Sequence, residues 1–291
     1  MALILFFAND DLLAKQTTSD SLLIELNQFR ANTPDYKKTE RYIDILNQLA
    51  HVYKYRTTDS VRIFSEEALK LSKSLDYGSG YALANLRLGD YHSETGKETE
   101  AAIYYDIALE QAMIIENPPI LVEVLKSKAM RAFLNLDLTE AVLTYYNAID
   151  RARNNNLLEA EAELRHNLGY LFYKFDLYNE AQVEYLVADS LWNIQQQFFK
   201  KAITSSNIAL NAIANEDFYT VLKYLNKSIG TIEKSSAQPM WLSRAYRAKS
   251  KYHLKVDSLY KSIIWAKKSD SVLSNLINER EQMDIDLLYS D

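Results

Sequence analysis

Apolar and small side chains recur along this chain at spacings of three and four residues. One such run holds Leu88 and His92, and a second run follows shortly after it with Ala101, Tyr105 and Ala108. This spacing is the period of an α-helix, whereas a β-strand would alternate apolar and polar positions with a period of two. The pattern therefore predicts two helices joined by a short polar turn.

The same two-helix pattern repeats along the chain in a fixed register. Each copy ends on a small residue at an equivalent position; these residues are Ala68, Ala108, Ala148, Ala188, Ser228 and Ala266. The positions seven residues earlier keep the same spacing; they are Val61, Ala101, Ala141, Ala181, Val221 and Leu259. The steps are 40 residues, except for a last step of 38. Such a register indicates about six copies of one helix pair.

Small residues at fixed points have a packing role. Two helices approach to about 8–10 Å only where the contacting residues leave room. We expect Gly89 and Gly169 to serve this close approach. We expect Tyr105, Tyr145 and Tyr185 to fill the wedge between one pair and the next, with their hydroxyl groups reaching the surface.

The order of Leu-Gly, an aromatic, and then Ala-x-x-x-Tyr resembles the tetratricopeptide repeat. That family repeats every 34 residues, so the period of about 40 resembles a subgroup with longer helices. The resemblance covers residues 39–272 and implies an all-α fold. That fold is a right-handed α-solenoid of about six tetratricopeptide-like helix-turn-helix repeats with flanking helices. Copy six departs from the pattern, because Arg244, Arg247 and Lys251 stand where apolar residues belong.

The repeats divide the chain into four segments. Residues 1–18 form an apolar N-terminal segment, and residues 19–34 form a capping helix. Residues 35–272 form the solenoid, and residues 273–291 form a C-terminal helix that would begin a linker to a missing output domain. Terminal helices of this kind cover the stacking faces that the end repeats of a solenoid expose.

The first seven residues leave two interpretations open. They are an uninterrupted apolar run, which Asp10 and Asp11 follow shortly afterwards, and no basic residue precedes them. The run is either the remnant of a secretory signal or a cytosolic terminus. We favour the signal, and hence a periplasmic location over a cytoplasmic one.

Composition narrows the function classes. The 291 residues contain 6 Gly, 4 Pro and no Cys. An all-β fold needs many Gly and Pro turns, and thiol catalysis, disulfides and cysteine metal sites need Cys. The four histidines lie far apart in the sequence, so we expect no metal site and no cofactor. We find no nucleophile, phosphate or dinucleotide motif and expect a protein that is not an enzyme.

Charge is distributed unevenly along the chain. Residues 1–199 carry a balance of −10, residues 200–268 of +9 and residues 269–291 of −5. The basic block includes Arg244, Arg247, Lys251 and Lys255, which share one face of a helix. This face is either a solvated or docking surface, or a strip that contacts nucleic acid or another anionic partner.

The resemblance also implies a binding surface. In this family the first helix of each pair lines a concave face that holds a peptide. Carried over by position, the peptide-binding residues are Asn47, His51, Arg87, Asp90, Lys126, Met130, His166, Asn167, Tyr170, Tyr173 and Asn207.

The favoured function is therefore a non-enzymatic scaffold or sensor module that binds a protein or peptide. The alternative is a regulatory protein that contacts nucleic acid or an anionic partner through residues 244–268. We expect no metal and no nucleic acid as partner under the favoured function. A membrane would be involved only if a longer parent protein is anchored there.

Overall fold

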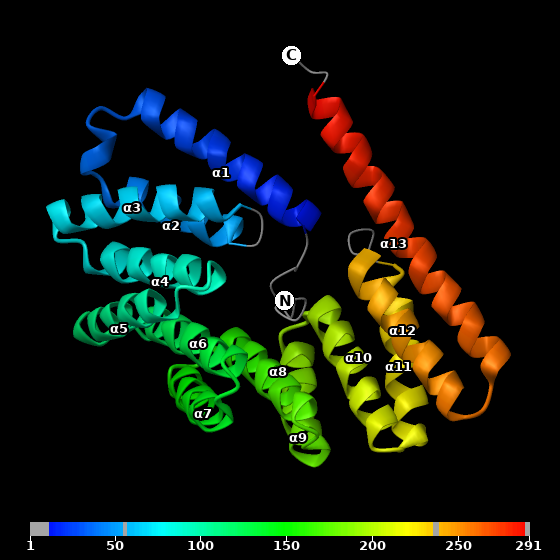
Figure 1. The fold of residues 1–291 in the computed structure, drawn as a ribbon. Coiled ribbons are helices and arrows are strands. Elements are labelled where there is room, and N and C mark those ends of the chain that lie inside the picture. Colours follow the sequence, from blue (N-terminus) through cyan, green and yellow to red (C-terminus); the bar gives the residue numbers. More distant parts are fainter. Residues whose placement is uncertain (1–11, 55–56, 235–238, 289–291) are drawn as a thin grey trace. The chain divides into compact units, whose positions relative to one another are not determined.

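The computed structural model describes residues 12–54, 57–234 and 239–288, and all regular elements in these residues are helical (Figure 1). The α-helices are α1 (Leu12–Asn32), α2 (Glu40–Tyr53), α3 (Thr58–Leu75), α4 (Gly78–Glu94), α5 (Glu98–Ile114), α6 (Pro118–Leu134), α7 (Leu138–Asn154), α8 (Leu158–Lys174), α9 (Tyr178–Ile194), α10 (Phe198–Ala214), α11 (Phe218–Ile232), α12 (Pro239–Lys255) and α13 (Leu259–Leu288). A short 3₁₀-helix, Tyr36–Lys38, joins α1 to α2. The all-α fold with consecutive helix pairs is confirmed.

The backbone repeats every 20 residues, which is half of the sequence period. Helices α4 to α10 are 17 residues each, and three residues connect each one to the next. The second connecting residue has a positive φ; these residues are Gly96, Glu116, Leu136, Asn156, Asp176, Gln196 and Glu216. Asp76, the first of the two residues between α3 and α4, also has a positive φ. The residue after it donates its N–H back into the last helical turn, as Asp137 does to the Ala132 carbonyl at 2.9 Å. One type of helix C-cap therefore serves the turns within pairs and between pairs.

Glycine provides the close approach inside a pair, as predicted. A Cβ built on Gly89 would lie 2.7 Å from the ring of Tyr105, and one built on Gly169 would lie 2.8 Å from the ring of Tyr185. The tyrosines do not place their hydroxyl groups at the surface, however. Tyr105 is buried, and its hydroxyl donates to Asp90 Oδ1 at 2.9 Å. The rings of Tyr105 and Tyr185 pack within a pair, where Gly89 and Gly169 leave room for them.

The chain divides into two compact units, residues 1–160 and residues 161–291, which we describe separately. In the first unit α2 packs on α4 and α4 packs on α6, so the first helices of successive pairs form one layer. In the second unit α10 packs on α12 in the same way. We call the face that these first helices form the inner face of each unit.

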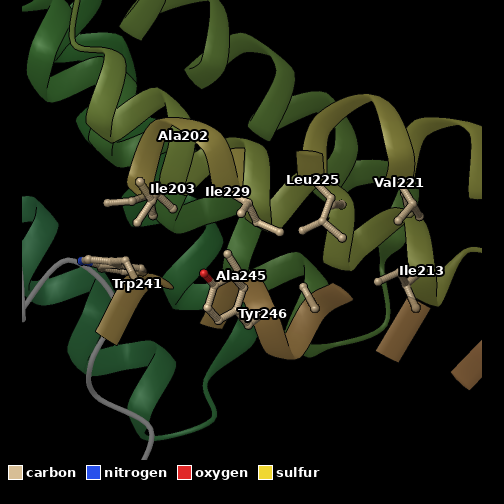
Figure 2. Close-up of a cluster of buried hydrophobic side chains, with 13 residues drawn as sticks. Ala202, Ile203, Ile213, Val221, Leu225, Ile229, Trp241, Ala245 and Tyr246 are labelled. Carbon is tan, nitrogen blue, oxygen red and sulfur yellow. The ribbon is translucent and has the colours of Figure 1, made fainter. Parts of the chain in front are cut away.

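The core of the second unit lies between α10, α11 and α12. Ile203, Val221, Leu225 and Ile229 meet Trp241 and its neighbours in a continuous buried cluster (Figure 2). The other two tryptophans, Trp192 and Trp265, also belong to this unit. The intrinsic fluorescence of the protein therefore comes from tryptophans of one unit alone.

The register that we predicted for copy six is wrong. Helices α11 and α13 begin at residues 218 and 259, which are 41 residues apart, so the connection before α12 is longer and not shorter. As a result Ser262 and Ser269 are buried, whereas Leu259 is 62% exposed and Ile263 is 46% exposed. Apolar residues fitted the repeat pattern by chance here, because the true core positions are serines.

The ends of the array differ from the predicted segments in their bounds. The capping helix predicted at 19–34 is α1, which begins earlier at Leu12. The C-terminal helix predicted at 273–291 is the continuation of α13, a single helix of 30 residues. The apolar run at residues 1–7 lies outside the described residues.

Candidate binding surface

A cluster of charged side chains occupies the inner face of the first unit, where α2, α4 and α6 meet. Asp90 on α4 is buried and receives three donors. Lys54 Nζ lies 2.8 Å from its carboxylate, the Tyr105 hydroxyl 2.9 Å, and Arg87 Nη1 3.3 Å. Arg87 also pairs with Glu123 on α6. We call Lys54, Arg87, Asp90 and Glu123 the inner-face charge cluster.

The ion pairs of this cluster shift the pKa values of its members. Burial alone would raise the pKa of Asp90, but the charges of Lys54 and Arg87 lower it below its usual value. Burial likewise opposes ionisation of Glu123, yet the Arg87 charge lowers its pKa to about 2. Both carboxylates therefore stay ionised near neutral pH, and the cluster joins three helices through charged groups.

Partly exposed side chains surround the cluster, and they are the groups on the inner face that a ligand can contact. The His51 side chain is 51% exposed, and its Nδ1 lies 3.7 Å from Glu123 Oε1. The positive charge of Arg87 lowers the pKa of His51, so the half-exposed imidazole is neutral near neutral pH. Burial raises the pKa of Glu94 to about 7. Lys126 and Met130 on α6 are partly exposed beside these groups.

The predicted residues of the second unit lie on α8 and α10. His166 is fully buried, with Nδ1 2.8 Å from Thr204 Oγ1 and Nε2 3.0 Å from Asn207 Nδ2. Thr204 donates its own hydroxyl hydrogen to the Lys200 carbonyl at 3.1 Å. Thr204 therefore accepts from Nδ1–H, and Asn207 donates to a bare Nε2. The network holds a neutral imidazole.

Several predicted contact residues are thus part of the packing. His166 has no exposed surface and positions Asn207 instead of meeting a ligand in this conformation. Asn47 is buried and donates to the Gly80 carbonyl at 3.2 Å, which joins α2 to α4. Arg87 and Asp90 are buried in the charge cluster. These polar residues of the first helices hold neighbouring helices together, because they form hydrogen bonds or ion pairs with buried backbone and charged groups.

Tyrosine and amide groups remain beside the inner face of the second unit. Tyr170 and Tyr173 contact each other with ring centroids 6.4 Å apart, and Tyr173 is partly exposed. Asn167 is buried, and its Oδ1 has no hydrogen-bond partner in the structure. Burial raises the pKa of Tyr170, while the nearby charge of Arg244 opposes the rise. Arg244 was not among the predicted peptide-binding residues.

The basic residues 244–268 are divided between internal contacts and the surface. Arg244 stacks on the Trp241 ring at 4.9 Å, and Lys249 lies 4.1 Å from the centroid of Trp265. Arg247 Nε donates to Ser269 Oγ at 3.3 Å. Part of the predicted basic strip therefore contacts aromatic residues and α13. A surface that faced outward to bind nucleic acid would not require these internal contacts.

The described part of the chain contains neither a metal-ion cluster nor a membrane-spanning helix. These residues include no group of three or more His, Asp or Glu side chains arranged to hold a metal ion. They also include no helix long and apolar enough to span a membrane.

Comparison with known proteins gives matches of fold. No protein-family model matches the chain, and no curated protein matches its sequence. A solved signal-transduction ATPase of the STAND class from Pyrococcus horikoshii, which has a tetratricopeptide repeat sensor, is similar with a TM-score of 0.68 and 13% identity. The alignment covers 91% of this chain and 43% of that one.

Two further solved structures share the fold. Aspartyl phosphate phosphatase F from Bacillus subtilis has a TM-score of 0.60 at 12% identity, covering 87% of this chain and 68% of that one. A Rap protein complexed with Competence and Sporulation Factor has a TM-score of 0.59 at 11% identity, covering 89% and 87%. The chain is therefore an α-solenoid of tetratricopeptide-like helix pairs.

Proposed function

We propose that this protein is a non-enzymatic module that binds a protein or peptide on its inner faces, as a scaffold or sensor of a signalling system. The carrying observation is the first unit, where three helices bring accessible His51, Glu123 and Lys126 together around a buried Arg87–Asp90 pair. The buried pair fixes the positions of the accessible groups. Such groups can pair with the backbone and charges of an extended ligand.

The fold neighbours support this proposal. A Rap protein of the same fold was solved in a complex with Competence and Sporulation Factor, and the STAND protein carries its repeats as a sensor. Another neighbour of the same fold is named aspartyl phosphate phosphatase F. The proposal includes two further points, namely that the protein is not a catalyst and that it is periplasmic. Mass spectrometry of the mature N-terminus tests the location.

The binding test uses accessible residues only, because substitution of buried Tyr170 or Asn207 would disturb the fold. A random-peptide phage library is panned on the full chain, and the enriched clones are tested against variants. We expect Lys126→Glu to lose binding of clones held by the first unit. Lys70→Glu makes the same charge change at an exposed position on α3 and should bind as the unchanged chain does.

A second matched pair addresses the second unit. Tyr173→Ala removes an accessible ring on α8, whereas Tyr219→Ala removes an exposed ring on α11. Clones that bind this unit should fail with the first variant alone. A library that yields no enriched clone, or clones that bind all four variants equally, would refute the inner-face proposal.

A further inference from the structure

The turn between α12 and α13 exposes more apolar surface than the corresponding turns of earlier repeats. We call residues 251–264 the α12–α13 tip; it contains the end of α12, the connection and the first turns of α13 (Figure 1). The corresponding stretches 91–104, 131–144, 171–184 and 211–224 each include one or two exposed large apolar side chains. The tip includes six; they are Leu254, Val256, Leu259, Tyr260, Ile263 and Ile264. The packing of the repeat does not require this excess, which indicates an interaction surface.

Four of these side chains form one face of α13. Leu259 and Ile263 are one helical turn apart, and so are Tyr260 and Ile264. Ser262, which lies between them in the sequence, is buried. Tyr260 is 78% exposed and Leu259 is 62% exposed. The first two turns of α13 therefore turn an apolar face away from the core.

Exposed lysines border this apolar face. Lys251 and Lys255 lie on α12 and Lys261 lies on α13, and all three are exposed. Asp257 is the one acidic residue of the tip, and Glu216 Oε1 of the α10–α11 turn lies 3.5 Å from Lys255 Nζ. Both side chains of that ion pair are more than half exposed, so water weakens it. The tip therefore combines apolar surface with an excess of positive charge.

This combination matches an anionic lipid surface better than it matches nucleic acid. A phosphate backbone would pair with the lysines but would leave the apolar side chains in water. Arginine is the preferred cation for nucleic-acid phosphates, and the nearby Arg247 instead donates to Ser269. A lysine stem can lie along apolar surface while its ammonium group reaches a phosphate. An anionic bilayer supplies hydrocarbon and phosphate together.

We propose that the α12–α13 tip binds the surface of an anionic lipid bilayer. Leu259, Tyr260 and Ile263 enter the headgroup layer, and Lys251 and Lys261 pair with lipid phosphates beside them. This contact uses none of the inner-face residues proposed to bind a peptide, so the two functions can be tested separately.

Flotation of the full chain with lipid vesicles tests the charged part of the proposal. The chain should bind vesicles of equal parts phosphatidylglycerol and phosphatidylcholine but not vesicles of phosphatidylcholine alone, and added salt should weaken the binding. Lys251→Glu/Lys261→Glu should weaken it by more than about tenfold, since two attracted charges become repelled ones. Lys70→Glu/Lys97→Glu makes the same change in net charge at exposed positions of the first unit and should bind as the unchanged chain does.

The same assay tests the apolar part. Leu259→Ser/Ile263→Ser should weaken vesicle binding about tenfold, because the variant loses apolar area that leaves water at the bilayer. Ile63→Ser/Leu143→Ser removes side chains of similar exposure from α3 and α7 and should leave vesicle binding unchanged. Circular dichroism checks that each variant is folded.

Tryptophan fluorescence reports whether the tip enters the bilayer. Leu259→Trp places an indole at the tip, and Leu143→Trp places one on α7 at a position with the same exposed fraction of 62%. Lipids brominated on their acyl chains should quench the first variant more strongly than the second. Equal quenching of the two variants would show that the tip stays outside the bilayer and would overturn the proposal.

Other outcomes would also overturn the proposal. They are a failure to bind the anionic vesicles, equal binding to phosphatidylcholine alone, and control pairs that weaken binding as much as the tip pairs do. Sedimentation velocity addresses a rival occupant, a second copy of this chain. Self-association that Leu259→Ser/Ile263→Ser abolishes, without any vesicle binding, would assign the tip to a contact between two copies.

Discussion

Protonation of buried His166 should make the second unit sensitive to acid. Burial, together with the charge of Arg244, lowers the pKa of His166 to about 3, whereas an unfolded chain has a histidine pKa of about 6.5. Thr204 and Asn207 satisfy the neutral ring, so a proton on Nε2 would require the Asn207 amide to rotate. The folded state therefore resists a proton that the unfolded state accepts.

The sign and size of the effect follow from this difference. Because the folded pKa is depressed, the stability contribution is complete above about pH 6.5 and is lost as the pH falls toward 3. At about pH 5 the unfolded chain already binds the proton while folded His166 does not. The free energy of unfolding should therefore fall by about 2 kcal/mol between pH 7.5 and pH 5 on account of His166.

Urea unfolding followed by tryptophan fluorescence measures this quantity, because all three tryptophans belong to the second unit. The comparison is with His166→Gln, whose amide does not titrate. The unchanged chain should lose about 2 kcal/mol more than the variant over this pH range. His253→Gln, at a partly exposed position on α12, should behave more like the unchanged chain. If His166→Gln lost as much stability as the unchanged chain, the buried neutral network would not exist in solution.

Five further substitutions test the packing by thermal unfolding. Gly89→Ala should destabilise by about 1–3 kcal/mol, since its Cβ would overlap a tyrosine ring, whereas Gly230→Ala in open space should stabilise by about 0.5–1 kcal/mol. Equal effects of these two Gly→Ala substitutions would contradict the close approach of the tyrosine ring to Gly89. Leu136→Gly should stabilise by about 0.5–1 kcal/mol because it relieves a φ of 61°, and Gly96→Ala should cost about 1 kcal/mol at a φ of 75°. Asp90→Ala should cost about 3–5 kcal/mol by removing the buried carboxylate that Lys54 and Arg87 both contact, and a loss below 1 kcal/mol would refute the cluster.

The repeat architecture could be predicted because its signal is redundant. Helical period, small contact residues and a 40-residue register all indicate the same helix pairs. The sixth copy shows the limit of this reasoning. A longer connection before α12 moved the core to Ser262 and Ser269, which carry no hydrophobic signal, while Leu259 and Ile263 imitated the pattern at exposed positions.

The candidate site could be predicted only in part, because position on a first helix does not decide burial. Arg87, Asp90 and His166 lie on inner-face helices as predicted. The side chain that pairs with each of them, however, determines whether it is buried or can meet a ligand. Whether such a residue faces solvent depends on the side chains of the neighbouring helix. Among those partners, Lys54 and Glu123 were missed, because a search by family position examines each repeat alone.

A signal for the missed partners was nevertheless present in the sequence. Lys54 and Asp90 are 36 residues apart, and so are Arg87 and Glu123. This separation is one 40-residue repeat less one helical turn, and a residue at that offset lies beside its partner on the next first helix. A side-chain amide follows a related rule, because Asn47 Nδ2 donates to the Gly80 carbonyl 33 residues further along the chain, one more turn back on the next first helix. In a solenoid of fixed period, opposite charges at this offset therefore indicate a bridge between neighbouring repeats and not a pair of free ligand contacts.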